Sequence, residues 1–181
     1  MPDDVFPPIL KTDRLILRAY AFQDAVDIFE YAGDPETTLY TTFDTHKCIY
    51  DTVDFLSNMR IRYENKTAYD YAIVSKENGK VIGGGGVMNT SKFPHTAEIG
   101  YILNKKYWGN GYAVEAMSAV IDYLFETLHI HRIEARHFAE NERSGRVMQK
   151  LGMTYEGMQV DAAYERERYH SVKYYALING D

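Results

Sequence analysis

The sequence predicts one α/β domain, in which a mixed and mostly antiparallel sheet is flanked by helices. Three observations lead to this fold class. Strand-like segments occur near both ends of the chain and in its middle. An Asn78-Gly79 pair joins two of them, which is a strong signal for an antiparallel hairpin. A long amphipathic segment separates two others, as in a strand–helix–strand unit.

The N-terminal half is expected to supply three strands and two helices. Residues 10–19 contain an apolar Leu-Ile-Leu run and are interpreted as a strand. Residues 23–32 have an acidic residue in the first turn and are followed by Gly-Asp-Pro, which predicts a helix that ends there. Residues 45–63 carry apolar positions typical of a second helix. Two further strands, 69–75 and 81–88, form the predicted hairpin.

The C-terminal half is expected to alternate strands and helices before it closes with two strands. A strand at 97–103 enters the loop 105–113, and an amphipathic helix leaves that loop. A strand at 132–138 and a short helix at 142–151 follow, and a glycine stands where a helix C-terminus favours one. The closing strands are expected at 153–160 and 169–178.

Length and composition indicate one soluble domain, with a core from about residue 10 to residue 178 of the 181-residue chain. Cys48 is the one cysteine, which excludes an internal disulfide and favours a reducing compartment. The first residues do not resemble a signal peptide, and no apolar run approaches the ~20 residues of a membrane-spanning helix. We therefore expect a cytoplasmic protein with no membrane partner, either a monomer or a homodimer.

The net charge of the chain indicates which kinds of binding partner are expected. The net charge is −6 and the isoelectric point about 5.5, which argues against direct nucleic-acid binding. An acidic chain suits a cationic small molecule or a basic protein, although the same charge also simply aids solubility. The six histidines lack metal-site spacing, so no metal is expected.

Two glycine-containing segments require separate interpretations. In the loop 105–113, Gly109 and Gly111 stand between a strand and a helix start. Free backbone N–H groups, close approach and the helix dipole make such a turn a phosphate cradle. The run 83–86 lacks the Lys-Ser/Thr ending of a P-loop and lies inside a strand pattern, so close backbone packing or a bulge is expected there.

Three motifs carry a resemblance to a known family. They are TDRLILR at 12–18, EIGY at 98–101 with YWGNGYA at 107–113, and NERS at 141–144 with KLGM at 150–153. In this order and spacing the chain resembles the GCN5-related N-acetyltransferases (GNAT), and more narrowly the ribosomal-protein N-terminal (Rim) group. The resemblance implies the GNAT fold and acetyl-CoA as cosubstrate.

The resemblance also implies the residues that meet acetyl-CoA. Residues expected to bind it are Tyr101, Ile102, Leu103, Trp108, Gly109, Asn110, Gly111, Tyr112, Ala113, Asn141, Ser144 and Lys150. Backbone N–H groups at 101–103 are expected where this strand separates from its neighbour, and they suit an oxyanion and the pantetheine arm. Asn141 is also a natural helix N-cap.

The sequence departs from the wider family at two positions. Trp108 stands where the pyrophosphate motif usually has Gln or Arg, so one side-chain contact is lost. Met148 stands where many members have a tyrosine that protonates the leaving thiolate, and a thioether donates no proton. Ser144 is the substitute donor that the Rim-like group suggests.

Glu98 is the candidate general base. The attacking amine must be neutral, and a carboxylate that faces the cleft can remove its proton through water. Strand alternation places Glu98 on one face with Gly100 and Ile102, and Tyr101 on the other. The glycine is expected to leave room beside Glu98 for an ordered water and an incoming amine. An exposed structural charge is the competing interpretation of this residue.

The expected activity is transfer of an acetyl group from acetyl-CoA to a primary amine. A protein N-terminal α-amine, possibly that of a ribosomal protein, is the leading acceptor. A polyamine or an amine antibiotic is the alternative acceptor. A catalytically silent acyl-CoA-binding module is the alternative from another class, because Met148 replaces the usual acid.

Overall fold

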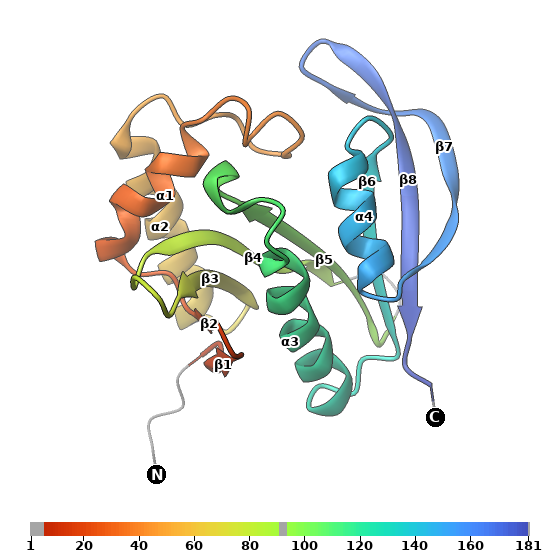
Figure 1. The fold of residues 1–181 in the computed structure, drawn as a ribbon, viewed down its shortest axis with the longest axis horizontal. Helices are drawn as coiled ribbons and strands as arrows, with labels where there is room; N and C mark the ends of the chain where they lie inside the picture. The colour runs from red at the N-terminus through yellow and green to blue at the C-terminus, as the bar shows by residue number, and fades with distance from the viewer. Residues whose placement is uncertain (1–5, 91–93, 181) are drawn as a thin grey trace.

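The computed structural model describes residues 6–90 and 94–180, and it forms one mixed sheet flanked by helices (Figure 1). Residues 1–5, which bear on the expected lack of a signal peptide, lie outside this description. The strand order is β1-β2-β3-β4-β5-β6-β8-β7. The strands are β1 Leu10–Lys11, β2 Leu15–Arg18, β3 Asp70–Ser75, β4 Val81–Thr90, β5 Thr96–Leu103, β6 Arg132–Phe138, β7 Thr154–Glu165 and β8 Arg168–Ile178.

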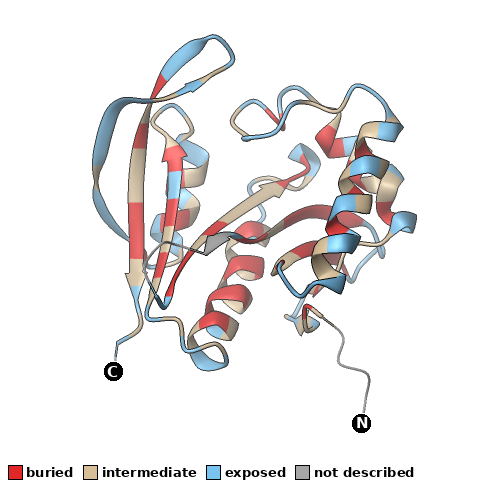
Figure 2. Ribbon diagram, turned by 180° about the vertical axis from the view of Figure 1, so that it is seen from behind, coloured by how far each residue is buried: buried red, intermediate tan, exposed pale blue. Residues whose placement is uncertain are grey.

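The helices divide between the two faces of this sheet (Figures 1 and 2). The α-helices are α1 Ala25–Ala32, α2 Ile49–Glu64, α3 Tyr112–Glu126 and α4 Glu142–Lys150, and the 3₁₀ helices are η1 Phe22–Asp24 and η2 Lys105–Tyr107. One apolar cluster packs α3 and α4 on the sheet through residues such as Met117 and Met148. A second cluster packs α1 and α2 on the other face through Ile28 and Leu56. No described helix is long and apolar enough to cross a membrane.

The sheet is antiparallel except between β5 and β6. These two strands pair in parallel over 96–98 and 132–134 only, and then they diverge (Figure 1). Over the rest of its length β6 pairs with β8 instead. The mixed sheet predicted from the sequence is therefore confirmed, and it opens at the one point where the strand direction changes.

Three predicted boundaries were wrong for local reasons. Residues 10–19 form two strands, because Thr12 closes a turn with Leu15 through its backbone N–H (3.1 Å) and its side-chain oxygen (3.0 Å). The second helix begins at Ile49, since Asp51 caps the preceding backbone N–H groups. The first closing strand extends to residue 165, because β7 pairs with β8 almost to the hairpin tip.

The glycine run within β4 serves close packing, as predicted. A Cβ at Gly84 would collide with the Tyr20 hydroxyl, and one at Gly86 would collide with the backbone of Tyr69. On the opposite face, a Cβ at Gly85 would lie 2.9 Å from the Met117 sulfur. The run thus allows Tyr20 and helix α3 to pack closely against opposite faces of β4.

Candidate active site

The opening between β5 and β6 exposes one side of the β5 backbone. The Asn104 N–H donates to the Ile82 carbonyl on β4 at 2.8 Å. Backbone groups of alternate residues point to opposite sides of an antiparallel strand, so those of Tyr101 and Leu103 face the opening. The Leu103 carbonyl accepts from the Trp108 indole N–H at 2.8 Å. The N–H groups of Tyr101 and Leu103 therefore face the space where the two strands part.

The predicted phosphate cradle is held in shape by its own polar groups. The Asn104 side chain accepts from the Lys106 N–H at 3.0 Å. The Asn110 amide donates to the carbonyls of Tyr107 and Trp108 at 3.3 and 3.2 Å. Gly111 is the N-cap of α3 with φ +80°, a conformation that side-chain-bearing residues rarely adopt.

The start of α3 has the groups that a diphosphate needs. Gly109 has φ +81° and open space at its Cβ position. Tyr112 and Ala113 are the first residues of the helix, whose initial N–H groups lack intrahelical partners. These groups and the helix dipole point toward the loop. The cradle therefore fits the pyrophosphate of acetyl-CoA, although no side chain at Trp108 supplies a cation.

A cation nevertheless lies close to this position. The guanidinium carbon of Arg143, in the first turn of α4, is 4.5 Å from the centre of the Trp108 ring. The arginine stacks on the indole face, a favourable cation–π arrangement. This contact could not be predicted from the sequence, because α4 and the loop are distant along the chain.

Ser144 and Asn141 lie together at the start of α4. Asn141 is the N-cap, and its side-chain oxygen accepts from the Ser144 N–H at 3.4 Å. The Tyr101 hydroxyl donates to the Ser144 carbonyl at 2.9 Å and lies 3.0 Å from the Ser144 hydroxyl. Tyr101 thus brings a side chain to Ser144, beyond the backbone contact predicted for it.

Burial keeps the Tyr101 phenol protonated. Desolvation raises the pKa of Tyr101 well above its ordinary value, and the contact with Ser144 lowers it only in part. A permanently protonated phenol remains a hydrogen-bond donor at every working pH. When it donates to the Ser144 carbonyl, its oxygen can accept a hydrogen bond from the Ser144 hydroxyl. Met148, one turn further along α4, is 2 % exposed and packs in the core.

Glu98 lies on the other face of β5 from Tyr101, as the alternation predicted. Ile102 packs with the α1–α2 cluster, whereas Leu103 packs with the α3–α4 cluster. The Glu98 carboxylate forms an ion pair with the Nε of Arg136 on β6 at 2.8 Å, and its side chain is 21 % exposed. The carboxylate is therefore fixed beside the opening by a neighbouring cation.

Two expected features of the site differ in the structure. Open room beside Glu98 was expected above Gly100, but a Cβ there would lie 2.7 Å from the Met88 side chain, which fills that space. Lys150 is the exposed last residue of α4, at the end opposite to Asn141. Its role toward the cofactor stays a prediction.

The site residues come from three parts of the fold. The β5 backbone, the loop before α3 and the first turn of α4 converge where β5 and β6 part. No group of three or more metal-ligating side chains occurs among residues 6–90 and 94–180. Such an arrangement offers backbone donors to a phosphate-bearing cofactor that lies along a strand.

Comparison with known proteins identifies the family. Residues 14–154 match the family described as "Acetyltransferase (GNAT) domain", so the chain belongs to the GCN5-related N-acetyltransferases. An uncharacterized N-acetyltransferase, YoaA of Bacillus subtilis, is 32% identical over 171 residues, covering 94% of this chain and 97% of that protein. The protein is an acetyl-CoA-dependent N-acetyltransferase.

Two further relatives refine the comparison. The [ribosomal protein uS5]-alanine N-acetyltransferase of Escherichia coli is 28% identical over 157 residues, covering 84% of this chain and 81% of that protein. The crystal structure of a GNAT-family acetyltransferase from Bacillus anthracis superposes with a TM-score of 0.86 at 29% identity, covering 96% of this chain and all of that one. The GNAT fold predicted from the sequence is confirmed.

Proposed function

We propose that the acceptor is the N-terminal α-amine of a protein, of the ribosomal-protein type. The observation that carries the proposal is the pairing of Glu98, the candidate base, with Arg136 at 2.8 Å. Because this carboxylate is held in an ion pair, the site favours an acceptor that needs little help to lose its proton. An α-amine has a pKa of about 7.7–8.0 and is partly neutral near pH 7.5, whereas a lysine amine near 10.4 is almost wholly protonated. Similarity to the uS5-alanine enzyme supports the same acceptor.

The proposed reaction uses both faces of β5. Acetyl-CoA supplies a thioester whose carbonyl carbon is attacked by the neutral amine. The N–H groups of Tyr101 and Leu103 stabilise the oxyanion and hold the pantetheine arm. Glu98 receives the amine proton through water, and the Ser144 hydroxyl donates a hydrogen bond to the departing sulfur.

The cofactor contacts proposed for the rest of the site follow its geometry. The loop Gly109, Asn110, Gly111, Tyr112 and Ala113 receives the pyrophosphate on its backbone N–H groups. Trp108 and Asn141 line the two sides of this path, one before α3 and one before α4.

An acceptor panel tests the proposal. The donor is acetyl-CoA, and the acceptors are a peptide with a free α-amine and no lysine, the same peptide α-blocked with one lysine, spermidine and an aminoglycoside. Thiol release is followed by a colorimetric reagent, and mass spectrometry locates the acetyl group. We expect turnover with the free α-amine peptide. Turnover restricted to the polyamine or the antibiotic would assign the protein to small-molecule acetylation instead.

A further inference from the structure

The turn between β1 and β2 contacts the first turn of α3. The Thr12 hydroxyl donates to one carboxylate oxygen of Glu115 at 2.5 Å. The Arg14 backbone N–H donates to the same oxygen at 2.9 Å, and its Nε donates to the other at 2.6 Å. Three donors from a segment about a hundred residues away therefore hold one glutamate.

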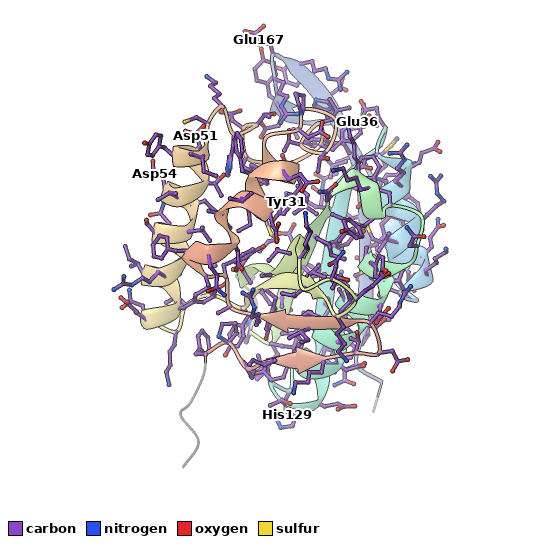
Figure 3. The ribbon with its side chains drawn as sticks, turned by 60° about the vertical axis from the view of Figure 1, so that its left-hand side comes forward. Tyr31, Glu36, Asp51, Asp54, His129 and Glu167 are labelled. Carbon is purple, nitrogen blue, oxygen red and sulfur yellow. The ribbon has the colours of Figure 1, made fainter. Side chains whose placement is uncertain are left out.

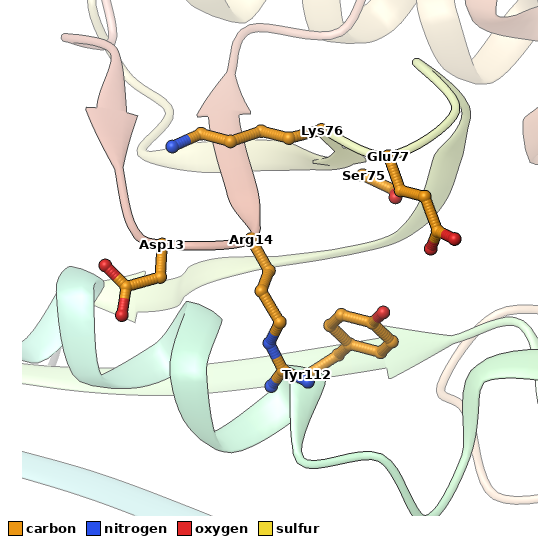
Figure 4. A pocket seen from close by; sticks show the side chains of 6 residues that line it. All are labelled: Asp13, Arg14, Ser75, Lys76, Glu77 and Tyr112. Atoms are coloured by element: carbon orange, nitrogen blue, oxygen red, sulfur yellow. The ribbon is translucent and has the colours of Figure 1, made fainter.

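The same arginine also contacts the loop that precedes α3. Its Nη1 donates to the Asn110 carbonyl at 3.1 Å. Its guanidinium carbon lies 4.3 Å from the centre of the Tyr112 ring (Figure 4). Its other terminal nitrogen is 3.7 Å from the position of a Cβ on Gly111. Arg14 thus touches three successive residues of the predicted phosphate cradle.

The position of Glu115 poses an electrostatic problem that this arrangement solves. Glu115 lies in the first turn of α3, where the helix dipole favours a negative charge. The same helix start is the proposed place of the anionic pyrophosphate, which an unpaired carboxylate would repel. Pairing with Arg14 neutralises the glutamate, and it leaves the helix dipole and the loop N–H groups for the phosphates.

The pairing is also preorganised before any ligand arrives. Thr12 is fixed by its own turn, because its side-chain oxygen accepts from the Leu15 N–H at 3.0 Å. The Glu115 side chain is 18% exposed, whereas the Arg14 side chain is 47% exposed. The glutamate is therefore the inner anchor, and the arginine extends from it along the outer side of the loop.

We propose that Arg14 and Glu115 are positioning residues that hold the 109–111 loop and the start of α3 in the shape that binds the cofactor's phosphates. The inference rests on the proposed place of the pyrophosphate and is independent of the acceptor. The residues act through the loop backbone, and neither needs to touch the cofactor. The expected consequence is a loss of affinity confined to donors that carry the phosphates.

Two variants and a matched control test this inference. Glu115→Gln removes the charge and Arg14→Gln removes the cation from a half-exposed position. Glu126→Gln makes the same charge change on an exposed residue at the opposite end of α3. Binding of CoA is measured by calorimetry, which needs no acceptor. Turnover is compared between acetyl-CoA and S-acetylpantetheine, a thioester donor without the phosphates and adenosine.

The expected outcome separates positioning from general damage. Glu115→Gln and Arg14→Gln should weaken CoA binding about fivefold to thirtyfold, the usual scale of coupling between neighbouring sites. Their kcat/KM with S-acetylpantetheine should match wild type, and Glu126→Gln should bind CoA as wild type does. Equal losses with both donors, or unchanged CoA affinity, would overturn the proposal. Because calorimetry involves no amine, a wrong acceptor assignment leaves this result intact.

Discussion

At the scale of single residues, the hydroxyl pair of Tyr101 and Ser144 is the proposed replacement for the tyrosine that many family members use. Met148 occupies that tyrosine's position and is 2 % exposed in the core, so no proton comes from there. Tyr101 donates to the Ser144 carbonyl and lies within hydrogen-bond distance of its hydroxyl. Tyr101 thereby holds Ser144 in place, and we propose that the serine proton turns to the sulfur as it departs.

Replacing Ser144 tests this arrangement. Ser144→Ala should lower turnover at saturating acetyl-CoA by about tenfold to a thousandfold, at or below the usual value of a positioned acid. The leaving thiol has a pKa near 8.5 and departs without strong help, which limits the loss. Stopped-flow or steady-state thiol release measures it. Met148→Leu, which keeps the core position apolar, serves as the control, and unaffected turnover in Ser144→Ala would assign the role to solvent.

Glu98 allows a prediction based on pH. Glu98→Gln should slow turnover most at low pH, where more of the acceptor amine is protonated and a proton acceptor matters. The defect should shrink as the pH rises past the pKa of the amine, because free amine needs no base. A pH–rate profile measures it, and affinity for acetyl-CoA should hardly change. A profile parallel to wild type at every pH would make Glu98 a structural partner of Arg136 only.

The sequence predicts some features of these residues and leaves others undetermined. Alternation along β5 correctly separated Glu98 and Ile102 from Tyr101, because a strand has a fixed period of two. It could not find Arg136, since that contact depends on the parallel register of β5 and β6. Long-range register follows from packing of the whole sheet and leaves no local signal.

At the scale of elements, the turn into α3 depends on a backbone conformation that only glycine adopts easily. Gly111 is the helix N-cap with φ +80°. The sequence predicts this glycine turn, because the spacing of the two glycines before an amphipathic helix is distinctive. The hydrogen bonds from Thr12 and Arg14 to Glu115 of this helix could not be predicted, because the sequence indicates one continuous strand over residues 10–19 and no turn at Thr12.

Gly111→Val tests the cradle. A β-branched residue at positive φ strains the turn and adds bulk where the ligand is expected to approach. Cofactor affinity measured by calorimetry on the folded variant should fall at least about tenfold, the cost of one lost charge-assisted contact. Gly157→Val is the matched control, because Gly157 also has a positive φ (+148°) with open space at its Cβ position, and it lies on β7 at the far edge of the sheet. Equal affinity in Gly111→Val and wild type would place the phosphates elsewhere.

At the scale of the whole molecule, ion pairs connect segments that are distant along the chain. Glu30 on α1 accepts from Lys106 at 2.5 Å, and Glu156 on β7 accepts from Arg132 at 3.0 Å. Glu36, in the loop after α1, pairs with Lys105 at 3.3 Å, whereas Tyr31 is buried beneath the helix (Figure 3). These contacts attach the α1 layer and the outer hairpin to the elements around the opening.

Their titration predicts the response to acid. Hydrogen bonds from Lys106 and Arg132 lower the pKa values of Glu30 and Glu156 below the ordinary 4.5. Burial raises the pKa of Glu115, but the donors Thr12 and Arg14 outweigh it, and the net pKa is lowered. A lowered folded-state pKa stabilises the protein above the unfolded value and loses that effect as the pH falls through the folded value. Asp70 acts in the opposite sense, because burial raises its pKa.

The free energy of unfolding should therefore begin to decline as the pH falls through about 6.5, because burial lowers the pKa values of His46 and His137, and it should decline further below about pH 4.5. Urea unfolding at a series of pH values measures it. Glu156→Gln should reduce the steepness of that decline, because one titrating pair is gone. An identical slope in the variant and wild type would show that the Arg132 pair contributes nothing to acid sensitivity.

The opening itself was anticipated from the family resemblance, and the strand pairing shows where it begins. β5 and β6 separate after Glu98 and Glu134, which follows from the one parallel pairing in an otherwise antiparallel sheet. The sequence predicted the order of elements because each has a clear period or turn. Apart from the hairpin of β3 and β4, it did not predict which strands would be neighbours, because strand order depends on contacts between distant segments.

A crystal structure of the protein with CoA tests most directly whether this opening is the cofactor site. We expect the pantetheine arm to pair with the backbone of Tyr101 and Leu103, with the pyrophosphate on the N–H groups of Gly109 to Ala113. The sulfur should lie within reach of the Ser144 hydroxyl. CoA bound away from the gap between β5 and β6, or with its phosphates distant from the start of α3, would contradict this description of the active site.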